Sequence, residues 1–395
     1  STEYDDKHNI PVLTAGKSFI IGHTNETNGI FNEIPVIIFD DFTTATKFVN
    51  FPFKVKSSAM KILSPVSKLV NIKYVFCYMQ TLRINADTHK RYWISHYSKL
   101  PVPFPPLPEQ HRIVAKIEEL FSSLDKGIES LKAAQQQLKI YRQAVLKWAF
   151  EGKLTNKNVK EGELPEGWKR VKLGNVCKNV EYGSAAKSKE EGKIPVLRMG
   201  NIQDGKFIWD DLVYTDNEIE IGKYLLKKND VLFNRTNSPE WVGKTAMYKG
   251  ERSAIFAGYL IRINRIETLI DALYLTYYLN SSVAKNYGSS VKTFGVNQAN
   301  INGTKLKTYP LPLPSLPEQH AIVAEIESRL SVCDKIEESI KQSLKQAESL
   351  RQSILKKAFA GKIVPQDPND EPTLKLLERI KMEKEKTVSK KRSCK

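Results

Sequence analysis

LPEQHRIVAKIEELFSSLDKGIESLKAAQQQLKIYRQAVLKWAFEGK, residues 107–153, occurs twice in this chain, because residues 316–362 align with it without a gap. Both copies open with LPEQH, continue with IVA and close with AFxGK, at 149–153 and 358–362. A different sequence separates the copies, so the chain alternates a variable part with a shared segment. This alternation predicts two similar globular heads, each joined to a shared segment.

Each copy of the repeat has the pattern of a long helix. Its apolar residues follow alternating steps of three and four, which is typical of a coiled-coil seam. Prolines precede both copies, and Gly152 and Gly361 stand near their C-terminal ends, as expected at the two ends of a helix. At about 1.5 Å per residue, a helix of about 40 residues is roughly 60 Å long.

An apolar seam of this length requires a partner. The expected partner is the other copy, in an antiparallel coiled-coil-like pair, because the intervening head lets the chain reverse. Packing of each helix on its own head, or homodimerisation, is the alternative. The residues expected at this helix-pair interface are Ile117, Leu120, Leu124, Leu131, Leu138, Tyr141, Val145, Ile326, Leu330, Ile336, Ile340, Leu344, Leu350 and Ile354.

Five parts are therefore expected along the chain. The variable heads cover residues 1–106 and 156–315, and the long helices cover residues 107–155 and 316–363. Residues 364–395 form a basic C-terminal tail. Because each head is long enough for its own core, the pattern predicts two domains separated by the helix pair.

The heads are expected to be mixed α/β, or α+β. In the second head, apolar runs between turn residues predict strands at Ile194–Gly200, Asp230–Phe233 and Ala254–Ile263, and Leu269–Leu279 suits a helix. The first head contains part of the same pattern, since Ile10–Leu13 repeats the IPVL sequence of the first predicted strand of the second head.

The first head is expected to be shortened at its start. Only nine residues precede Ile10, whereas about 30 lie between Glu163 and the matching strand of the second head. A strand of the first head is therefore expected to be missing, unless the segment after Lys362 takes its place.

Positive charge is unevenly distributed along the chain. The formal net charge is +17, and the excess lies in the two heads and the tail, whereas the repeated helices are nearly neutral. This distribution is expected if the heads bind a polyanion and the helices bind protein. A basic protein whose charge only aids solubility is the alternative. No apolar run reaches the roughly 18 residues of a membrane span, so a cytoplasmic location is expected.

The common motifs of catalytic and ligand sites are absent from the sequence. The four cysteines stand apart from one another and from histidines at ligand spacing, so neither disulfides nor a metal site is expected. There is no adenine-methylation motif, no dinucleotide-binding glycine motif and no nuclease carboxylate cluster. Gly243-Lys244-Thr245 imitates the end of a phosphate loop, but Ser238 stands where that loop requires glycine. No catalytic residue and no cofactor are therefore expected on this chain.

Several motifs resemble one known family. The segments PPLPEQHRIV (105–114) and PLPSLPEQHAIV (312–323), each leading a long helix to AFxGK, resemble the conserved regions of type I restriction-modification specificity subunits. In the heads, Gly167-Trp168, Ile194–Arg198, Asp230–Phe233 and Val242–Lys244 are similar to the target recognition domains of that family. The YWIS at 92–95 is also similar to family members.

The resemblance implies a function without a reaction. In that family each target recognition domain reads one half of a split, asymmetric DNA sequence, and the helices fix the spacer between the halves. Two methyltransferase subunits bring S-adenosylmethionine, and two restriction subunits can add ATP- and Mg-dependent translocation and cleavage. A coiled-coil scaffold or dimerisation protein without sequence readout is the second hypothesis.

Polar turns in the heads supply the candidate DNA contacts. Base edges are read by Arg, Lys, Asn, Gln, Ser and Thr, and phosphates by Lys, Arg, Tyr and backbone N–H groups. Ordinary solvated loops rich in turn formers are the alternative. The candidates in the first head are Lys17, Ser18, His23, Asn25, Lys90, Arg91, Tyr92 and His96. Those in the second head are Arg198, Asn201, Arg235, Thr236, Asn237, Lys244, Lys292, Thr293, Asn297, Gln298 and Asn300.

Overall fold

The computed structural model describes residues 4, 7–14, 19–82, 91–156, 158–296 and 298–393, and of residues 386–393 the backbone alone. The chain divides into two compact units. Unit 1 comprises residues 1–132 and 341–395, and unit 2 comprises residues 133–340. Head 1 (residues 1–106) belongs to unit 1 and head 2 (residues 156–315) to unit 2.

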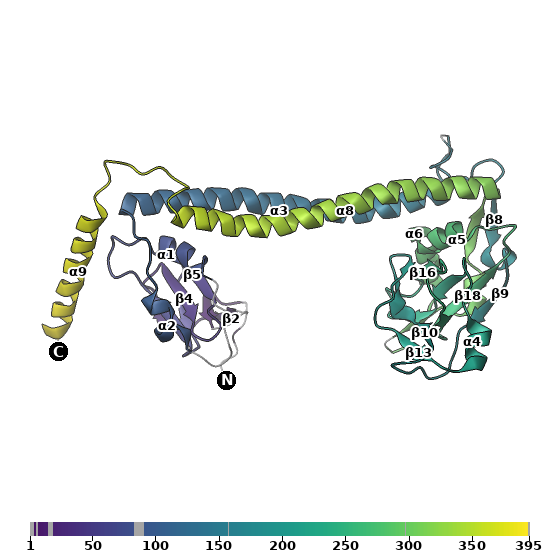
Figure 1. Cartoon of the computed structure of the whole chain (residues 1–395), viewed down its shortest axis with the longest axis horizontal. Helices are drawn as coiled ribbons and strands as arrows, with labels where there is room; N and C mark the ends of the chain where they lie inside the picture. Colours follow the sequence, from purple (N-terminus) through teal and green to yellow (C-terminus); the bar gives the residue numbers. More distant parts are fainter. Residues whose placement is uncertain are drawn as a thin grey trace. The chain divides into compact units, whose positions relative to one another are not determined.

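Both repeated segments form long helices. α3 covers Leu107–Phe150 and α8 covers Leu316–Phe359, with 44 residues each (Figure 1). The first half of α3 and the second half of α8 belong to unit 1, and the remaining halves belong to unit 2.

Glycines end both long helices. Gly152 has a φ of 78° and Gly361 a φ of 70°, in the left-handed region that favours glycine. After the first of them, the Lys153 N–H donates to the Trp148 carbonyl at 2.8 Å, and the same bond follows Gly361. This is the hydrogen bond of a Schellman stop, so the repeated AFxGK motif is a helix terminator.

In unit 2 the second half of α3 runs antiparallel to the first half of α8. Arg142 donates to Asp334 at 2.6 Å and to Glu337 at 3.0 Å. Further along α3, Phe150 lies in the same apolar cluster as Ile326, which comes earlier in α8. Residues that come later in α3 therefore meet residues that come earlier in α8.

In unit 1 the first half of α3 packs against the end of α8 in the same antiparallel sense. Ile117 shares an apolar cluster with Leu355. Asp125 forms an ion pair with Arg351, whose guanidinium lies 4.4 Å from the centre of the Phe121 ring. Apolar contacts and ion pairs thus alternate along this half of the pair.

The seam of the pair differs from the expected one at three residues. Ile336 and Leu350 are 43% and 50% exposed, and Tyr141 is 38% exposed. The side chains of Glu337 and Arg351 cross between the helices instead, because a long polar side chain can cover a seam and end in an ion pair. The buried positions of α8 recur every seven residues, at Ile326, Cys333, Ile340, Ala347 and Ile354.

The other residues expected at the interface face protein. Some are buried, namely Ile117, Val145, Ile326, Ile340 and Ile354. The rest are partly buried, namely Leu120, Leu124, Leu131, Leu138, Leu330 and Leu344.

Head 2 contains two main sheets. In the larger, β14 (Val231–Asn234) is buried along its whole length, as its continuous apolar sequence favours. β14 lies between the antiparallel strands β16 (Thr245–Met247) and β18 (Leu260–Arg265), and β9 (Cys177–Tyr182) pairs with the other edge of β18. In the second sheet, one strand has an antiparallel and a parallel neighbour. Its strands are β10 (Ile194–Leu197), β13 (Val213–Thr215) and β17 (Ile255–Phe256).

Shorter elements complete head 2. The helices are α4 (Glu218–Tyr224), α5 (Ala272–Asn280), α6 (Ser282–Val291) and α7 (Gly303–Lys307), with 3-10 turns at Leu173–Asn175 and Met199–Asn201. The remaining strands are β8 (Lys169–Lys172), β11 (Ile202–Gln203), β12 (Lys206–Phe207), β15 (Thr236–Asn237), β19 (Thr293–Phe294), β20 (Ala299–Asn300) and β21 (Pro310–Leu313). The predicted strand at Ala254–Ile263 is thus two strands, β17 and β18.

Head 1 repeats this plan. β4 (Val36–Asp40), buried throughout, lies between β5 (Thr46–Val49) and β7 (Met60–Leu63), as β14 lies between β16 and β18. In the other sheet a central strand again has an antiparallel and a parallel neighbour. Its strands are β1 (Ile10–Leu13), β2 (Ile20–Thr24), β3 (Ile30–Phe31) and β6 (Phe53–Val55). The helices are α1 (Ile72–Met79) and α2 (Tyr92–Ser95), followed by a 3-10 turn at Tyr97–Lys99.

The strands β8 and β9, which precede β10 in head 2, have no counterpart among the described strands of head 1. Unit 2 pairs β8 with β21 and β9 with β18, whereas in unit 1 β7 is an edge strand. The segment after Lys362, considered as a possible replacement strand, is not one. Its Ile363 and Val364 pack on the cluster around Ile117, and it continues into helix α9 (Thr373–Ser393).

Candidate nucleic-acid interface

A tyrosine joint attaches head 2 to the long helices within unit 2. Tyr274 and Tyr278 on α5 donate their hydroxyl protons to the carbonyls of Pro312, at 2.8 Å, and of Pro310. The ring of Phe150, the last residue of α3, packs edge-on against both tyrosine rings, with centroids 5.3 and 5.2 Å away. The head is therefore held by the segment that leads into α8 and by the end of α3.

A glutamine of the repeated LPEQH motif completes the joint. Buried Gln319 accepts a hydrogen bond from the Asp271 N–H at 2.8 Å and donates to the carbonyls of Pro314 (3.0 Å) and Leu269 (2.9 Å). The Asp271 carboxylate caps the N-terminus of α5. Because a buried amide costs free energy when its bonds are unmade, this motif requires glutamine here.

The same joint occurs in unit 1. Tyr74 donates to the carbonyl of Pro103 at 2.7 Å, and Tyr78 donates to that of Pro101 at 2.8 Å. Phe359, the last residue of α8, lies 5.1 Å from each tyrosine ring. Each head is thus held by the phenylalanine that closes one copy of the repeat.

The other copy supplies the glutamine. Gln110 accepts from the Asn71 N–H at 2.9 Å and donates to the Pro105 carbonyl at 2.9 Å. Proline has no N–H, so the lead-in prolines offer the tyrosines acceptors only. Burial raises the pKa of Tyr74 and Tyr278, so both hydroxyls keep the proton that they donate.

Two polar loops that lie far apart in the sequence come together in head 2. β15 pairs with β20, and β20 pairs with β19, which together form a three-stranded sheet called the loop sheet below. The Asn300 side chain donates to the Thr236 hydroxyl at 2.6 Å. At the turn of the loop sheet Phe294 is 65% exposed and Val296 is fully exposed. The loop sheet therefore presents its turn to solvent.

The candidate residues of the loop sheet divide into accessible and structural ones. Thr293 and Gln298 are exposed. Thr236, Asn237 and Asn300 are partly buried, and the Asn237 side chain accepts from the Ser238 N–H at 2.8 Å. The accessible pair can reach a ligand directly, whereas the other three shape the loop.

Arg235 precedes the loop sheet and packs inward. Its Nη1 donates to the Gly258 carbonyl at 3.0 Å, and its guanidinium lies 4.8 Å from the centre of the Tyr182 ring. Its Nε is buried without a hydrogen-bond partner. Arg235 therefore ties the loop to its neighbours and keeps a partly buried positive charge beside it.

Two lysines adjoin the loop sheet. Lys292 donates from Nζ to the Pro239 carbonyl at 3.1 Å. Lys244 donates to the Gln203 side chain at 2.7 Å and lies 4.0 Å from the centre of the Trp241 ring, which is 50% exposed. Burial lowers the pKa of Lys244. Cations beside exposed aromatic rings are typical of surfaces that bind nucleic acid strands.

Two candidates in the 198–201 turn are engaged by the fold. Asn201 is 3% exposed, and its side chain donates to the Asp210 carbonyl and accepts from the Arg198 N–H. Arg198 donates from Nη2 to the Asp211 carbonyl at 2.7 Å and carboxylate at 3.1 Å. Asn201 stays a predicted DNA contact, but the structure gives its side chain a buried, turn-forming role.

In head 1 one candidate is also buried. Tyr92 is 3% exposed and packs beside Phe39 in the core around α1 and α2, because the Asp41 carbonyl and carboxylate fix the start of α2. Asn25, Arg91 and His96 are exposed. His23 is partly buried on β2. Lys17, Ser18, Lys90 and Asn297 lie outside the described residues.

Within the described ranges, nothing resembles a metal or membrane site. No group of three or more His, Cys, Asp or Glu side chains that could hold a metal ion is found there. Cys77, Cys177 and Cys333 are free and buried. None of the described helices is both long and apolar enough to cross a membrane.

Sequence reasoning missed the tyrosines of the joint. The signal was present, since Asn71 and Asp271 each precede tyrosines by three and seven residues, but it lay outside the aligned repeat.

Comparisons with known proteins agree on one family. Residues 165–346 match the family model of the type I restriction modification DNA specificity domain. The specificity subunit of the type I restriction enzyme EcoR124I/EcoR124II from Escherichia coli is 32% identical over 376 residues, which cover 89% of this chain and 85% of that subunit.

Solved structures share the fold. A chain from a study of complex assembly and conformational transition of the type I R-M system matches with a TM-score of 0.65 at 20% identity, covering 83% of this chain and 82% of its own. The HsdS subunit from Thermoanaerobacter tengcongensis matches with a TM-score of 0.54 at 20% identity, covering 83% and 81%.

Proposed function

Because the chain belongs to the specificity subunits of type I restriction-modification systems, we propose that head 1 and head 2 each read one half of a bipartite, asymmetric DNA target. Specificity subunits bind DNA and catalyse no reaction; methylation and cleavage are carried out by the methyltransferase and restriction subunits with which they associate. S-adenosylmethionine, ATP and Mg therefore belong to those partners. The cytoplasm is the expected location.

The observation that carries this proposal is the duplicated joint. Both heads use two tyrosines, two proline carbonyls, one glutamine and one phenylalanine to contact the long helices. A chain that attaches two different heads by the same contacts is expected to use the heads for the same kind of task. Reading two half-sites is such a task, with residues 1–106 and 156–315 as the two target recognition domains.

The surface of head 2 supports a DNA-reading role. The side chains of Thr293 and Gln298 are exposed, and Lys292 directly precedes Thr293 in the chain. Amide and hydroxyl groups read base edges, and lysines contact phosphates. A turn that carries both base-reading groups and lysines can enter a groove of DNA while the lysines contact the phosphates of the DNA backbone.

The long helices are proposed to set the spacer and to bind two methyltransferase subunits. On the pair, exposed Tyr141 lies 6.5 Å from the Trp148 ring, and its hydroxyl contacts Arg329 of α8. Tyrosine, tryptophan and arginine are the residues that dominate binding energy in protein interfaces. A cluster of all three, with both rings exposed and Arg329 partly buried, is therefore a suitable docking surface.

The methylome of cells that co-express this chain with a cognate methyltransferase subunit tests the proposal. The expected result is a split motif with modified adenine in both halves. A motif with one defined half would limit reading to one head. A stable complex without any motif would overturn DNA readout in favour of the scaffold alternative.

A second experiment tests the spacer. Inserting one helical turn after Ala134 of α3, matched by one turn after Lys341 of α8, which lies opposite in the register set by Arg142 with Asp334 and Asp125 with Arg351, adds about 5.4 Å to the pair. The expected result is a longer spacer between unchanged half-sites. A motif whose spacer stays the same would contradict the proposed spacer function of the helices.

A further inference from the structure

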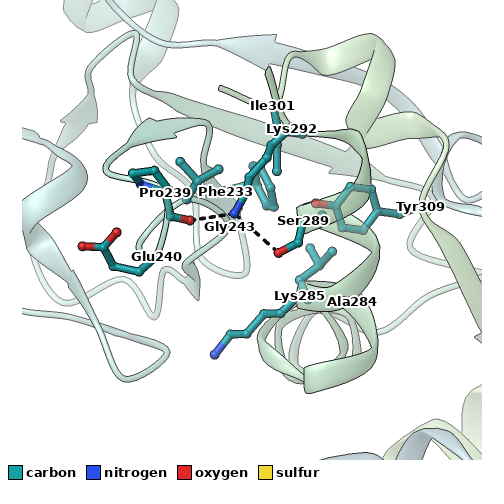
Figure 2. A pocket seen from close by; sticks show the side chains of 13 residues that line it. Phe233, Pro239, Glu240, Gly243, Ala284, Lys285, Ser289, Lys292, Ile301 and Tyr309 are labelled. Atoms are coloured by element: carbon teal, nitrogen blue, oxygen red, sulfur yellow. Dashed lines mark hydrogen bonds between the residues drawn. The ribbon is translucent and has the colours of Figure 1, made fainter. Parts of the chain in front are cut away.

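A cavity in head 2 lies between the loop at residues 239–243 and helix α6 (Figure 2). Its volume is about 150 Å³. The floor is apolar, with Phe233, Ala284, Ile301 and Tyr309. The rim is polar, and the residues that form it are Lys285, Ser289, Lys292 and Glu240. The cavity therefore combines a fixed floor with mainly basic edges.

Helix α6 and the residue that caps its C-terminus, Lys292, supply three of the rim residues. Lys285, Ser289 and Lys292 are spaced by four and three residues, which brings side chains to the same side of a helix. Lys292 Nζ bridges the cavity, donating to the Pro239 carbonyl at 3.1 Å and the Ser289 hydroxyl at 3.5 Å (Figure 2). Its position is thereby fixed without an acidic partner.

Lys285 differs from Lys292 because no hydrogen bond or ion pair occupies its ammonium among the described residues. The side chain is accessible to solvent along part of its length. The protein around its ammonium nevertheless lowers the pKa of Lys285 by desolvation, an effect that Asp204 partly opposes. Lys285 is thus accessible to a ligand, and a bound anion would stabilise its charged form, which desolvation disfavours.

Lys244 adds a further cation beside Lys285. Burial lowers the pKa of Lys244, Asp204 opposes this shift, and the charge of Lys285 adds to it. Three lysines therefore share the region with two carboxylates, Asp204 and Glu240, which leaves a net positive charge. Figure 2 shows the Glu240 carboxylate on the loop side, away from the Lys285 ammonium.

We propose that Lys285, Ser289 and Lys292, with Lys244 beside them, bind one backbone phosphate of the DNA whose bases face the loop sheet. The inference rests on the proposed function. A phosphodiester oxyanion accepts hydrogen bonds from ammonium and hydroxyl groups without regard to sequence. The site is an anchor that fixes the position of head 2 on the duplex, and the exposed loop-sheet residues read the bases.

Lys285→Gln in the full chain, complexed with methyltransferase subunits, tests the anchor. The measurement is the Kd for cognate and non-cognate duplexes across a salt series. Both Kd values should rise by roughly threefold to tenfold at low salt, and the slope of log K against log salt should shrink by about one. The ratio between cognate and non-cognate affinity should stay the same.

Two variants serve as controls. Lys249→Gln removes an exposed lysine from the opposite end of β16 and should leave the salt slope unchanged. Lys285→Arg keeps the charge and should restore most of the affinity. The melting temperature of Lys285→Gln should equal or exceed that of the wild type, because the ammonium has no partner to lose.

Three results would overturn the anchor. An unchanged salt slope would remove Lys285 from the DNA interface. A loss of affinity for cognate DNA alone would show that Lys285 reads a base and does not bind a phosphate. Lys285-dependent binding of inorganic phosphate, measured by calorimetry, with an unchanged DNA slope would make the cavity a free-anion site. If the wild-type complex does not discriminate between duplexes, the proposed function fails and the inference fails with it.

Discussion

Head 1 and head 2 share a scaffold but differ in the residues that end the central strand. β14 ends at Asn234 and is followed by Arg235, whereas β4 ends at Asp40 and is followed by Asp41. Asp41 is 2% exposed and accepts from the Trp93 N–H at 2.8 Å. The same place in the fold thus carries a positive charge in one head and a negative charge in the other. A common scaffold with opposite charges below the loop is suited to two different half-sites.

The sheets of the two heads also differ at one edge. In head 2, Arg262 of β18 pairs with Glu181 of β9 at 2.6 Å and with Asp230 at 3.1 Å. In head 1 the corresponding residue is Ile62 on the edge strand β7. Because Arg262 is only 9% exposed, its buried charge needs both carboxylates. Strand β9, which supplies Glu181, and the ion pairs of Arg262 therefore depend on each other.

A third difference lies against the long helices. Tyr277 of α5 packs beside α8, where Glu327 and Asp334 influence its hydroxyl. The corresponding residue of α1 is Cys77, and beside it an open groove of about 550 Å³ is lined by Phe76, Phe121 and neighbouring residues. A small side chain in place of a large one leaves this groove unfilled.

The largest expected effect separates the two joints. Phe150→Ala should lower the free energy of unfolding of unit 2 by about 3–5 kcal/mol, because a buried ring between two tyrosines leaves a cavity. Phe359→Ala should cost unit 1 about 2–3 kcal/mol, because Phe359 is only partly buried. Hydrogen exchange of α5 and α1 reports each unit separately. Phe42→Ala, which removes an exposed ring, is the control. If either joint variant reduced the protection of α5 and of α1 equally, the assignment of Phe150 to unit 2 and of Phe359 to unit 1 would be contradicted.

The second effect tests the edge strand. Arg262→Ile, which copies head 1, should destabilise unit 2 by about 2–3 kcal/mol, since Glu181 and Asp230 lose their partner while remaining partly screened by solvent. Denaturant unfolding measures the loss. Adding Glu181→Val to Arg262→Ile should recover at least half of the lost stability. A double variant as unstable as Arg262→Ile would show that the pairing of β9 with β18 does not depend on the ion pair between Arg262 and Glu181.

A smaller effect concerns base reading. Gln298→Ala should weaken discrimination at one base pair by about 1–3 kcal/mol, because one amide stops contacting a base edge. The change should appear in one half of the methylated motif. Asn25→Ala in head 1 should alter the other half. A variant that blurs both halves would argue against independent heads.

The smallest effect uses pH. Burial raises the pKa of the Cys77 thiol to about 11, so the thiol stays protonated at neutral pH although the groove beside it is open. Alkylation by iodoacetamide should be slow at pH 8 and should accelerate about tenfold per pH unit up to about pH 11, because the thiolate is the nucleophile. Cys77→Ser is the control. Rapid labelling at pH 8 would show that the thiol is not desolvated.

The sequence predicted the elements that depend on local or repeated patterns. The two long helices, their glycine ends and the strands β10 and β14 follow from periodicity and turn residues. Ile336 and Leu350 were misplaced because steps of three and four admit neighbouring seams. The choice between these seams depends on ion pairs such as Arg351 with Asp125, which join residues far apart in the chain.

The site was harder to predict than the fold. Asn201 and Tyr92 have suitable chemistry but are buried, and burial is a property of tertiary packing that a polar turn in the sequence does not reveal. The meeting of residues 236–237 with residues 293–300 in the loop sheet likewise requires the folded head.

The duplicated joint has a consequence for inheritance. Each head contacts the long helices through residues that both units share, among them a glutamine from one copy of the repeat and a phenylalanine from the other. Recombination between genes at the repeated segment would replace a whole head while preserving the contacts that attach it. Among the residues that a new head must supply for these contacts are the N-cap residue of its helix, its two tyrosines and its prolines. Under the proposed function, such an exchange would change one half of the DNA target without redesign of the helices.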